Sequence, residues 1–409
     1  MLLDWSDKTF RPQGPCQRSS WEDPQVNFLA RITVAGAALM ALTCSAQAQV
    51  KIGIVISMTG PAATLGLPQK AAIALMPKEV DGTLIDYITL DDASDPTTAR
   101  RLVDRLITED KVDILMGPTI SPSALAVIEA AGKSKTPILT FAAARSIVEP
   151  MDDIKRWAYK TTINDDVFAR ATADFMIKKG QKKVGIIGFN DAYGESWFGA
   201  FNQAAKATGI EIVASEKYNK NDTSVTAQAL KVIAARPDAV LIIGAGTPGV
   251  LPQSTLLERG YQGAIYQTTG VTTNDFLRVG GKSVEGAIIA TGPLIVASQL
   301  PDSNIAKKPA IEFADAYNKA NGENSVSAFP GFAWDAFLLA RAAIPLAVKK
   351  AKPGTPEFRA EVNEALETNQ RVITTSGPVT MTPQSHSGFT AESLVMIQVK
   401  NGRWTYIEK

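Results

Sequence analysis

The chain has 409 residues, with 42 Lys and Arg against 41 Asp and Glu, so its formal net charge is +1. This balance gives no basic excess for nucleic acid or an anionic membrane surface, and we expect no nucleic-acid partner. One histidine and two cysteines exclude a zinc site built from these residue types, and we expect neither a metal nor a cofactor.

Residues 26–48 have the pattern of an export signal. Arg31 precedes the apolar run 32–43, which is shorter than the ~20 residues that span a bilayer. Ala46-Gln47-Ala48 supplies the small-residue pattern of a signal-peptidase site. We therefore expect cleavage near Ala48 and a periplasmic protein. A lipid anchor on Cys44 is the alternative.

Residues 1–25 lack the short basic start of a signal peptide and contain acidic residues and prolines. We expect a non-native or disordered extension here, with the natural start near Val26; N-terminal sequencing tests this. Cys16 and Cys44 both precede the expected cut. The exported chain would then carry no disulfide and no thiol chemistry.

From Val50 onward, short apolar strands alternate with helical patterns, which predicts parallel sheets covered by helices on both faces. The first set of predicted strands covers residues 50–56, 84–90, 112–116 and 136–141. The predicted helices between them cover residues 66–80, a segment opened by Asp95-Pro96, and a segment from Ser121-Pro122 to Gly132.

A second set repeats this rhythm. Its predicted strands cover residues 182–189, 210–218, 239–243, 264–268 and 286–291, and its helices cover residues 193–208, 223–235, 248–259 and 272–279. Helices over 309–321, 328–350 and 356–367 follow. A hairpin joins 394–399 to 404–407, because Asn401-Gly402 favours a tight primed turn.

Two such sets predict an α/β fold of two doubly wound parallel-sheet lobes joined by a three-strand hinge. We expect lobe 1 to comprise residues 49–162 and 294–374, and lobe 2 residues 163–293 and 375–409. The hinge strands are expected near 161–164, 292–294 and 374–377. Ligands bind where parallel strands end, so the informative loops follow Ile56, Met116, Phe141, Phe189, Ile243 and Thr268.

These loops carry a set of motifs whose order and spacing are specific together. They are Ile52-Gly53-Ile54 through Ser57-Met58-Thr59-Gly60-Pro61 with Gly66, Asp91-Asp92 with Asp95-Pro96, Gly117-Pro118 with Ser121, Asn190-Asp191-Ala192-Tyr193-Gly194, and Ala333-Trp334-Asp335-Ala336. On these motifs residues 50–409 resemble the type I periplasmic solute-binding proteins of ABC transporters, in the branched-chain amino-acid (Leu/Ile/Val) class. The resemblance implies a non-enzymatic monomeric receptor that closes on a small ligand and delivers it to an inner-membrane permease.

The resemblance also implies where the ligand binds. In the family a ligand carboxylate meets a serine hydroxyl and backbone N–H groups at a helix start, a site that unpaired helix donors favour. Ser121 matches that serine, and Ala142-Ala143-Ala144 matches the second carboxylate segment. Ala144 replaces a usual threonine and is followed by Arg145, a candidate carboxylate clamp. The other expected lining residues are Leu65, Thr119, Tyr193, Gly246, Thr247, Thr269 and Phe329.

Departures from the family pattern point to the ligand. A tyrosine is common at Leu65 and an aromatic residue near Gly246, so this chain leaves room for a larger apolar group. In the resemblance, Thr269 stands where the family has the glutamate that meets a ligand ammonium. A desolvated ammonium without an anionic partner binds weakly. We therefore expect a carboxylate ligand without an amine, an aromatic or aryl-keto acid; the alternatives are a branched-chain amino acid, or a sensing module of a signalling receptor.

Other motifs have structural interpretations that we prefer. Gly244–Gly249 fits a dinucleotide-binding glycine pattern, but no acidic ribose partner ends the next strand. Asp91, Asp92 and Asp95 are better explained by helix capping than by a metal. A catalytic triad would have to use His386, the one histidine of the chain. An enzyme of this α/β fold is not expected, because the chain lacks a nucleophile elbow and a phosphate loop.

Overall fold

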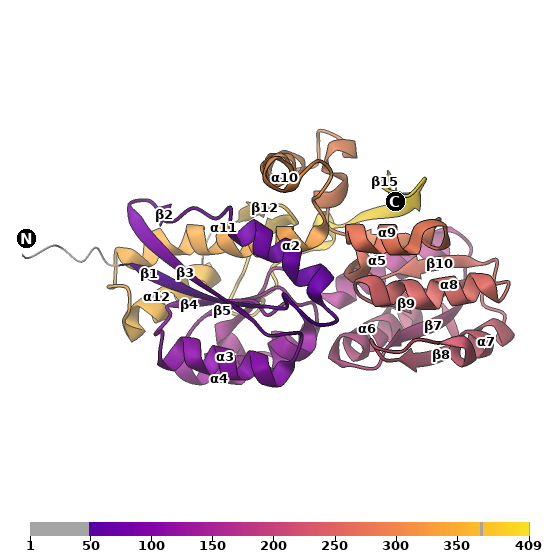
Figure 1. The fold of residues 1–409 in the computed structure, drawn as a ribbon, viewed down its shortest axis with the longest axis horizontal. Coiled ribbons are helices and arrows are strands. Elements are labelled where there is room, and N and C mark those ends of the chain that lie inside the picture. Colours follow the sequence, from indigo (N-terminus) through magenta and orange to yellow (C-terminus); the bar gives the residue numbers. More distant parts are fainter. Residues whose placement is uncertain (1–48, 369–370, 409) are drawn as a thin grey trace, which may run out of the picture. The chain divides into compact units, whose positions relative to one another are not determined.

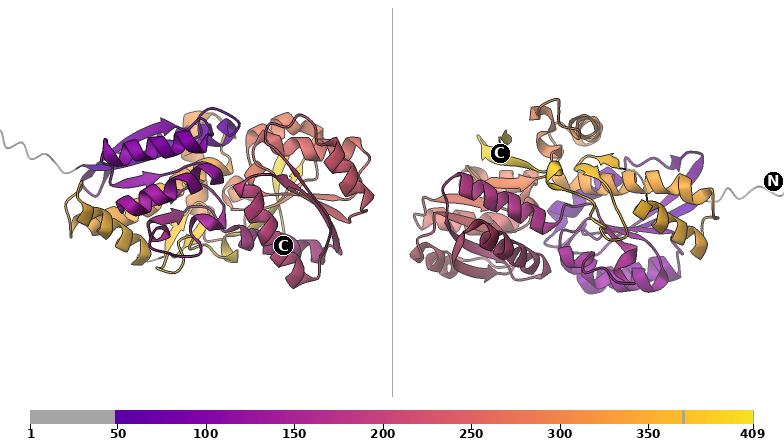
Figure 2. Two further views of the ribbon diagram at one scale, coloured as in Figure 1. Left: turned by 90° about the horizontal axis from the view of Figure 1, so that it is seen from below. Right: turned by 180° about the vertical axis from the view of Figure 1, so that it is seen from behind.

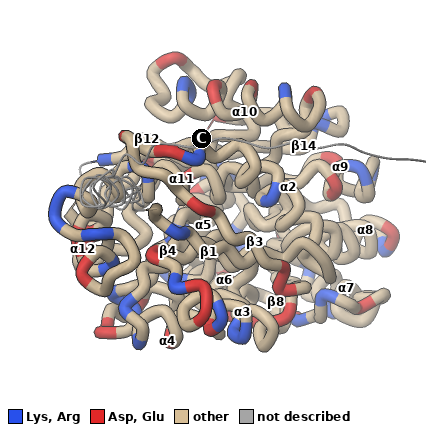
Figure 3. Tube along the Cα trace, turned by 60° about the vertical axis from the view of Figure 1, so that its left-hand side comes forward, with Lys and Arg blue, Asp and Glu red and all other residues tan. Residues whose placement is uncertain are grey.

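The computed structural model describes residues 49–368 and 371–408. The extension and the export signal expected over residues 1–48 lie outside the described residues. Figure 3 shows acidic and basic residues interspersed along the chain in one view.

The first sheet has six strands in the order β2-β3-β1-β4-β5-β6, all parallel except the short β2–β3 pair. The strands are β1 (Val50–Ile56), β2 (Glu79–Val80), β3 (Thr83–Asp91), β4 (Ile114–Met116), β5 (Ile138–Thr140) and β6 (Ala158–Lys160). Its helices are α2 (Ala63–Ile73), α3 (Pro96–Thr108), α4 (Ser121–Ser134), α10 (Lys307–Asn321), α11 (Ala328–Val348) and α12 (Pro356–Thr368). We call this sheet with its helices the first lobe.

Helices cover both faces of the first sheet, with α2 and α11 on one side and α3 and α4 on the other (Figures 1 and 2). The alternation of a strand decides which residue meets which layer. Ile52 and Ile54 of β1 join the core that includes α11, whereas Val55 joins the core with α3 and α4. Helix α11 is apolar almost throughout, and most of its residues are buried inside the protein. It is therefore the central core helix of this lobe.

The second sheet has seven strands in the order β15-β14-β11-β10-β9-β7-β8. The strands are β7 (Lys183–Phe189), β8 (Glu211–Tyr218), β9 (Ala239–Ile243), β10 (Ala264–Gln267), β11 (Ile288–Thr291), β14 (Val395–Lys400) and β15 (Arg403–Ile407). The first five are parallel and the last two antiparallel. Helices α5 (Asp165–Lys178), α6 (Ala192–Thr208), α7 (Thr226–Ala234), α8 (Val250–Glu258) and α9 (Asn274–Gly280) complete the second lobe.

Both lobes are doubly wound around parallel sheets, so the expected fold class is confirmed. A separate two-stranded pair, β12 (Val372–Thr374) and β13 (Gly377–Val379), follows α12. Short 3₁₀ turns are η1 (Arg145–Ile147), η2 (Lys155–Trp157), η3 (Thr247–Gly249), η4 (Thr269–Val271), η5 (Gly281–Val284), η6 (Leu294–Gln299) and η7 (Ala391–Ser393). The expected residue limits of the lobes and hinge stay predictions.

One expected helix is too long, and one observed helix was not expected. The helix predicted over residues 66–80 ends at Ile73, and Val80 belongs to a hairpin whose Asp81-Gly82 turn has positive φ at both residues. Asp-Gly is a strong signal for such a turn. Helix α5 was not predicted, although Asp165 and Asp166 occupy its first turn and its buried residues recur at helical spacing. The hairpin at Asn401-Gly402 is confirmed.

Candidate functional site

A cavity lies where loops at the carboxyl ends of the parallel strands meet. The empty space between its walls is about 500 Å³, a volume that includes the part open to solvent. Its lining comprises Leu65 of α2, Thr119, Ile120, Ser121 and Pro122 after β4, Phe141, Ala142 and Ala143 after β5, Thr162 after β6, Phe189 and Tyr193 around the β7–α6 connection, Lys220 after β8, Ala245 after β9, Thr269 and Gly270 after β10, and Phe329 and Phe332 of α11. This is the position at which open parallel sheets bind ligands.

Ser121 stands at the start of α4, and its side chain is set by the neighbouring loop. It was expected to be the ligand serine at a helix start; the N-cap is Ile120, and Ser121 is the first helical residue. Its hydroxyl oxygen accepts the backbone N–H of Ala144 at 3.1 Å. Among the described residues, no acceptor takes the hydroxyl hydrogen. Ser121 therefore offers a buried donor beside the first turn of α4, whose N–H groups lack helical partners.

The loop after β5 is held from behind by two side chains. The Ala142 carbonyl accepts the Thr162 hydroxyl at 2.7 Å, and the Ala143 carbonyl accepts a hydrogen bond from the Lys160 ammonium. Lys160 is fully buried, and burial lowers its pKa even though Asp165 faces it. The same burial raises the pKa of Asp165. These contacts fix the loop that forms the floor of the cavity.

Thr119 lines the cavity, but its hydroxyl is used inside the first lobe. The oxygen accepts the Ser57 N–H at 3.0 Å, and the hydroxyl donates to the Gln69 side-chain oxygen at 2.6 Å. Thr119 therefore contributes shape to the cavity rather than a polar contact.

The second lobe contributes Tyr193 and Thr269, both expected from the sequence. Burial raises the pKa of Tyr193, so its hydroxyl is a neutral donor; it approaches Thr268 and the Gly270 backbone without forming a well-aligned hydrogen bond. The Thr269 hydroxyl lies 2.9 Å from that of Thr291. Neither residue brings a charge to the cavity.

Aromatic rings form much of the remaining wall. Phe329, which was expected, packs edge-to-face with Phe332 at 5.5 Å between ring centroids. Phe141 after β5, Phe189 at the end of β7 and Tyr193 in the first turn of α6 add three further rings. Only Phe329 and Tyr193 were identified from the sequence. Phe141 follows β5, Phe189 ends β7 and Phe332 lies in the apolar helix α11, so a core interpretation of each is equally natural.

Lys220 is a lining residue that the sequence analysis missed. It follows β8, whose loop was not among those singled out, although it also lies at the carboxyl end of a parallel strand. Its ammonium pairs with Asp191 at 2.6 Å and lies 5.5 Å from the centre of the Phe189 ring. It is the one ionisable cation among the described residues that line this cavity, and no Asp or Glu is among them.

Four expected residues do not line the cavity. Ala144 is buried behind the loop, where its N–H meets Ser121. Arg145 lines a different groove and pairs with Glu149 at 2.5 Å and with Asp166 at 3.7 Å. Gly246 faces α2, and an added Cβ would lie 2.8 Å from the Thr64 hydroxyl. Thr247 begins the short turn after it.

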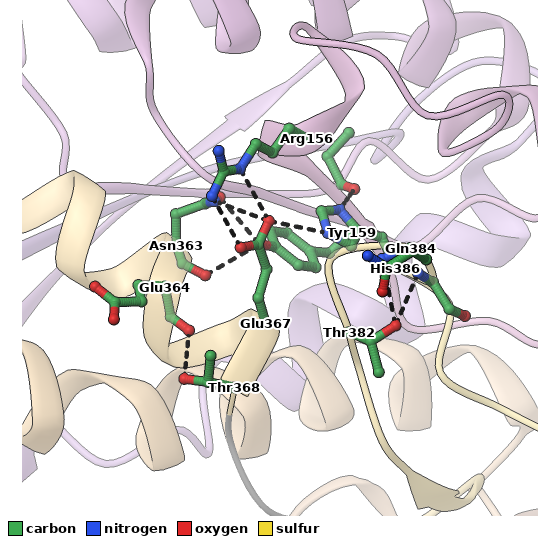
Figure 4. A network of polar contacts seen from close by, with 11 residues as sticks. Arg156, Tyr159, Asn363, Glu364, Glu367, Thr368, Thr382, Gln384 and His386 are labelled. Carbon is green, nitrogen blue, oxygen red and sulfur yellow. Dashed lines mark hydrogen bonds and ion pairs between the residues drawn. The ribbon is translucent and has the colours of Figure 1, made fainter.

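His386 belongs to a buried network away from the cavity (Figure 4). Its Nδ1 lies 2.9 Å from the Ala158 carbonyl, and its Nε2 lies 3.4 Å from a Glu367 oxygen. The ring stacks on Tyr159 at 4.1 Å, and Arg156 pairs with Glu367. These contacts join β6, α12 and the C-terminal segment, so the role of His386 is structural.

Residues 49–403 match the sequence family described as periplasmic binding protein. The chain belongs to the periplasmic binding protein family. A relative of this periplasmic binding protein, the Leu/Ile/Val-binding protein BraC3 of Rhizobium johnstonii, is 25% identical over 86% of this chain and 92% of the relative.

Solved structures agree with the family. An extracellular ligand-binding receptor from Rhodopseudomonas palustris HaA2 is 45% identical, with a TM-score of 0.85 over 88% of this chain and all of that one. A solute-binding protein of an ABC transporter from R. palustris BisB5, solved with 3,4-dihydroxybenzoic acid, has a TM-score of 0.73 at 24% identity, covering 88% of this chain and 96% of its own. This second likeness shows the shared fold alone.

Proposed function

We propose that this solute receptor serves an ABC importer in the periplasm and binds a small aromatic or aryl-keto carboxylate without an amino group. The partner would be an inner-membrane permease, and the receptor would act as a monomer. The lobes would close by bending near residues 161–164, 292–294 and 374–377.

The observation that carries this proposal is the charge of the cavity lining. Its described residues include Lys220 but no acidic residue. A ligand ammonium would lose its hydration and contact only hydroxyls and carbonyls, near the Lys220 cation. The free-energy cost of desolvating it would be poorly offset. A carboxylate would meet the Ser121 hydroxyl and the start of α4, which favour an anion.

The walls support an aromatic group on the ligand. Five rings line the cavity, and offset or edge-to-face ring contacts add about 0.5–1.5 kcal/mol beyond buried area. Leu65 and Ala245 add apolar surface and no polar side-chain atom. The dihydroxybenzoic acid held by the R. palustris BisB5 protein is a ligand of this class on the same fold.

The alternative ligand is a branched-chain amino acid, and the name of the Rhizobium relative favours it. In that case an ammonium would have to use Thr269, backbone carbonyls or water. The two proposals differ in one chemical group, the α-amine, so they can be separated by binding alone.

The test is isothermal titration of the purified protein, unfolded and refolded once to remove carried-over ligand. Leucine, valine and phenylalanine are compared with benzoate, phenylacetate, benzoylformate and 4-hydroxycinnamate. We expect tight binding of at least one aromatic acid and none of the amino acids. Tight binding of leucine or valine instead would overturn the proposed ligand class and leave the receptor assignment standing.

A further inference from the structure

We propose that Lys220 is the second-lobe partner of the ligand carboxylate, so that one anionic group bridges Lys220 and the Ser121 end of α4. This inference rests on the proposed function in requiring a carboxylate, but it does not require the ligand to be aromatic. It assigns Lys220 as a specificity-determining residue and gives the anion a role in holding the closed form.

The position of Lys220 carries the first step. It lines the cavity together with Ile120, Ser121 and Pro122 at the start of α4. It also lines an adjoining hollow with Ile120, Pro122 and Phe189. Lys220 and the first turn of α4 therefore face the same space from the two lobes. A carboxylate held by Ser121 would therefore face a cation contributed by the other lobe.

The lysine is held ready for this contact. Asp191 lies 2.6 Å from its ammonium, and the Phe189 ring lies beneath it. Asp191 is fixed in turn, because its other oxygen accepts the Gly194 N–H at 3.0 Å as the N-cap of α6. An ammonium has three donors. The contact with Asp191 is an ion pair without an aligned hydrogen bond, so the donors of the ammonium are open to an incoming anion.

Burial makes the contact selective. The Lys220 and Asp191 side chains are 25% and 18% exposed, so solvent screens this pair less than it screens a surface pair. A carboxylate gains a charge-assisted hydrogen bond here, whereas a neutral amide of the same shape gains only a weaker one. The α-amine of an amino acid would meet a like charge, and the Asp191 carboxylate beside it is already paired with Lys220.

The chain offers a matched control three residues earlier. Lys217 pairs with Glu195 near the start of α6 and lies 5.5 Å from the Phe198 ring, so its chemistry copies that of Lys220. It is 44% exposed and does not line the cavity. Its removal should leave binding unchanged.

The experiment titrates Lys220→Met, Lys220→Arg and Lys217→Met with benzoylformate, or with whichever of the seven acids the wild type binds best. A charge-assisted hydrogen bond predicts a loss of affinity of about 10- to 100-fold in Lys220→Met. Lys220→Arg should recover most of it, and Lys217→Met should match the wild type. The wild-type affinity should fall between 20 mM and 500 mM salt, and that of Lys220→Met should change less.

Outcomes separate this inference from the proposed function. Equal affinity of Lys220→Met and wild type, with unchanged thermal unfolding, would overturn the role of Lys220 whichever acid binds. A large loss in Lys220→Met measured with leucine would support the role of Lys220 and overturn the aromatic ligand class. A wild-type protein that binds none of the acids would overturn both.

Discussion

The hydroxyl oxygen of Ser121 accepts the backbone N–H of Ala144 at 3.1 Å, which ties the start of α4 to the loop after β5. The acceptor role of the hydroxyl is thereby occupied, and its hydrogen is directed elsewhere. Two elements that would contact one carboxylate are thus fixed relative to each other before a ligand arrives. Such preorganisation lowers the entropic cost of binding.

Removing the Ser121 hydroxyl should weaken binding of the aromatic acids without unfolding the protein. In Ser121→Ala the ligand loses one donor, and the Ala144 N–H loses its partner. We expect about a tenfold or greater loss of affinity by titration calorimetry, about 1.4 kcal/mol or more. Ser134→Ala, in the last turn of the same helix, is the control, since its hydroxyl donates to Ala131 far along α4. Equal losses in both variants would contradict the site.

An acid at position 269 should exchange the ligand preference. Thr269 lines the cavity and is 5% exposed. In Thr269→Glu a carboxylate would oppose the ligand anion and offer a partner to an ammonium. We expect the affinity for benzoylformate to fall by about tenfold or more, and leucine binding to appear.

The control for that exchange is Thr269→Gln, which has the same size without the charge. It should not gain leucine binding. If the glutamine variant and the glutamate variant both acquire leucine binding to the same extent, the charge argument is wrong and shape decides the preference.

Asp335 of α11 should be a strong stability determinant. It is fully buried, and its carboxylate accepts the Thr375 N–H and hydroxyl, each at 2.8 Å, and the Ser376 N–H at 3.1 Å. Asp335→Ala leaves these buried donors without an acceptor, at a cost of about 3 kcal/mol in the free energy of unfolding. Denaturant unfolding measures it. Arg341→Ala, exposed on the same helix, should change stability by less than about 0.5 kcal/mol.

The same carboxylate predicts a pH dependence. Burial raises the pKa of Asp335 to about 6, above the ordinary value of 3.8, because desolvation outweighs its hydrogen bonds. The folded state therefore holds this proton more tightly than the unfolded chain. The stability from that proton is present below pH 4 and is lost as the pH rises through 6, about 3 kcal/mol in all. The difference in unfolding free energy between wild type and Asp335→Asn should shrink as the pH rises from 4 to 6. A constant difference would contradict the raised pKa of Asp335.

His386 predicts the opposite trend. Burial lowers its pKa, because desolvation outweighs the attraction of Glu367. The unfolded chain then binds the proton more readily, so stability is lost as the pH falls below about 6.5. Chemical unfolding from pH 7.5 to 5 should show a smaller decline for His386→Gln than for the wild type. An equal decline would assign the acid sensitivity to other groups.

The fold was largely predictable because its strands are short, apolar and regularly spaced. The predicted strand 239–243 coincides with β9. Asp95 caps α3, because its carboxylate accepts the Thr98 backbone N–H, as the Asp-Pro pattern indicates. The errors arose where two signals competed. A helical pattern through residues 66–80 outweighed the Asp81-Gly82 turn, and the charged start of α5 hid its apolar face.

The lining of the candidate cavity was predictable only where a motif marks it. Ser121, Tyr193, Thr269 and Phe329 line the cavity, and each had a counterpart in the family pattern. Lys220 has no such motif, and only the strand order reveals that its loop reaches the same cavity. Arg145 shows the converse, because local pairing with Glu149 removes a charge that looked available in the sequence.

The C-terminal segment touches both lobes, and this affects how the chain can fold. The Lys160 N–H on β6 donates to the His386 carbonyl, and the His386 ring meets Ala158, 228 residues earlier in the chain. A few residues later, β14 and β15 complete the second sheet. Contacts of such separation form slowly, because a long loop must close before they stabilise anything. We therefore expect neither lobe to reach its final stability during synthesis, and the protein to acquire its structure as a whole once its last strand has emerged.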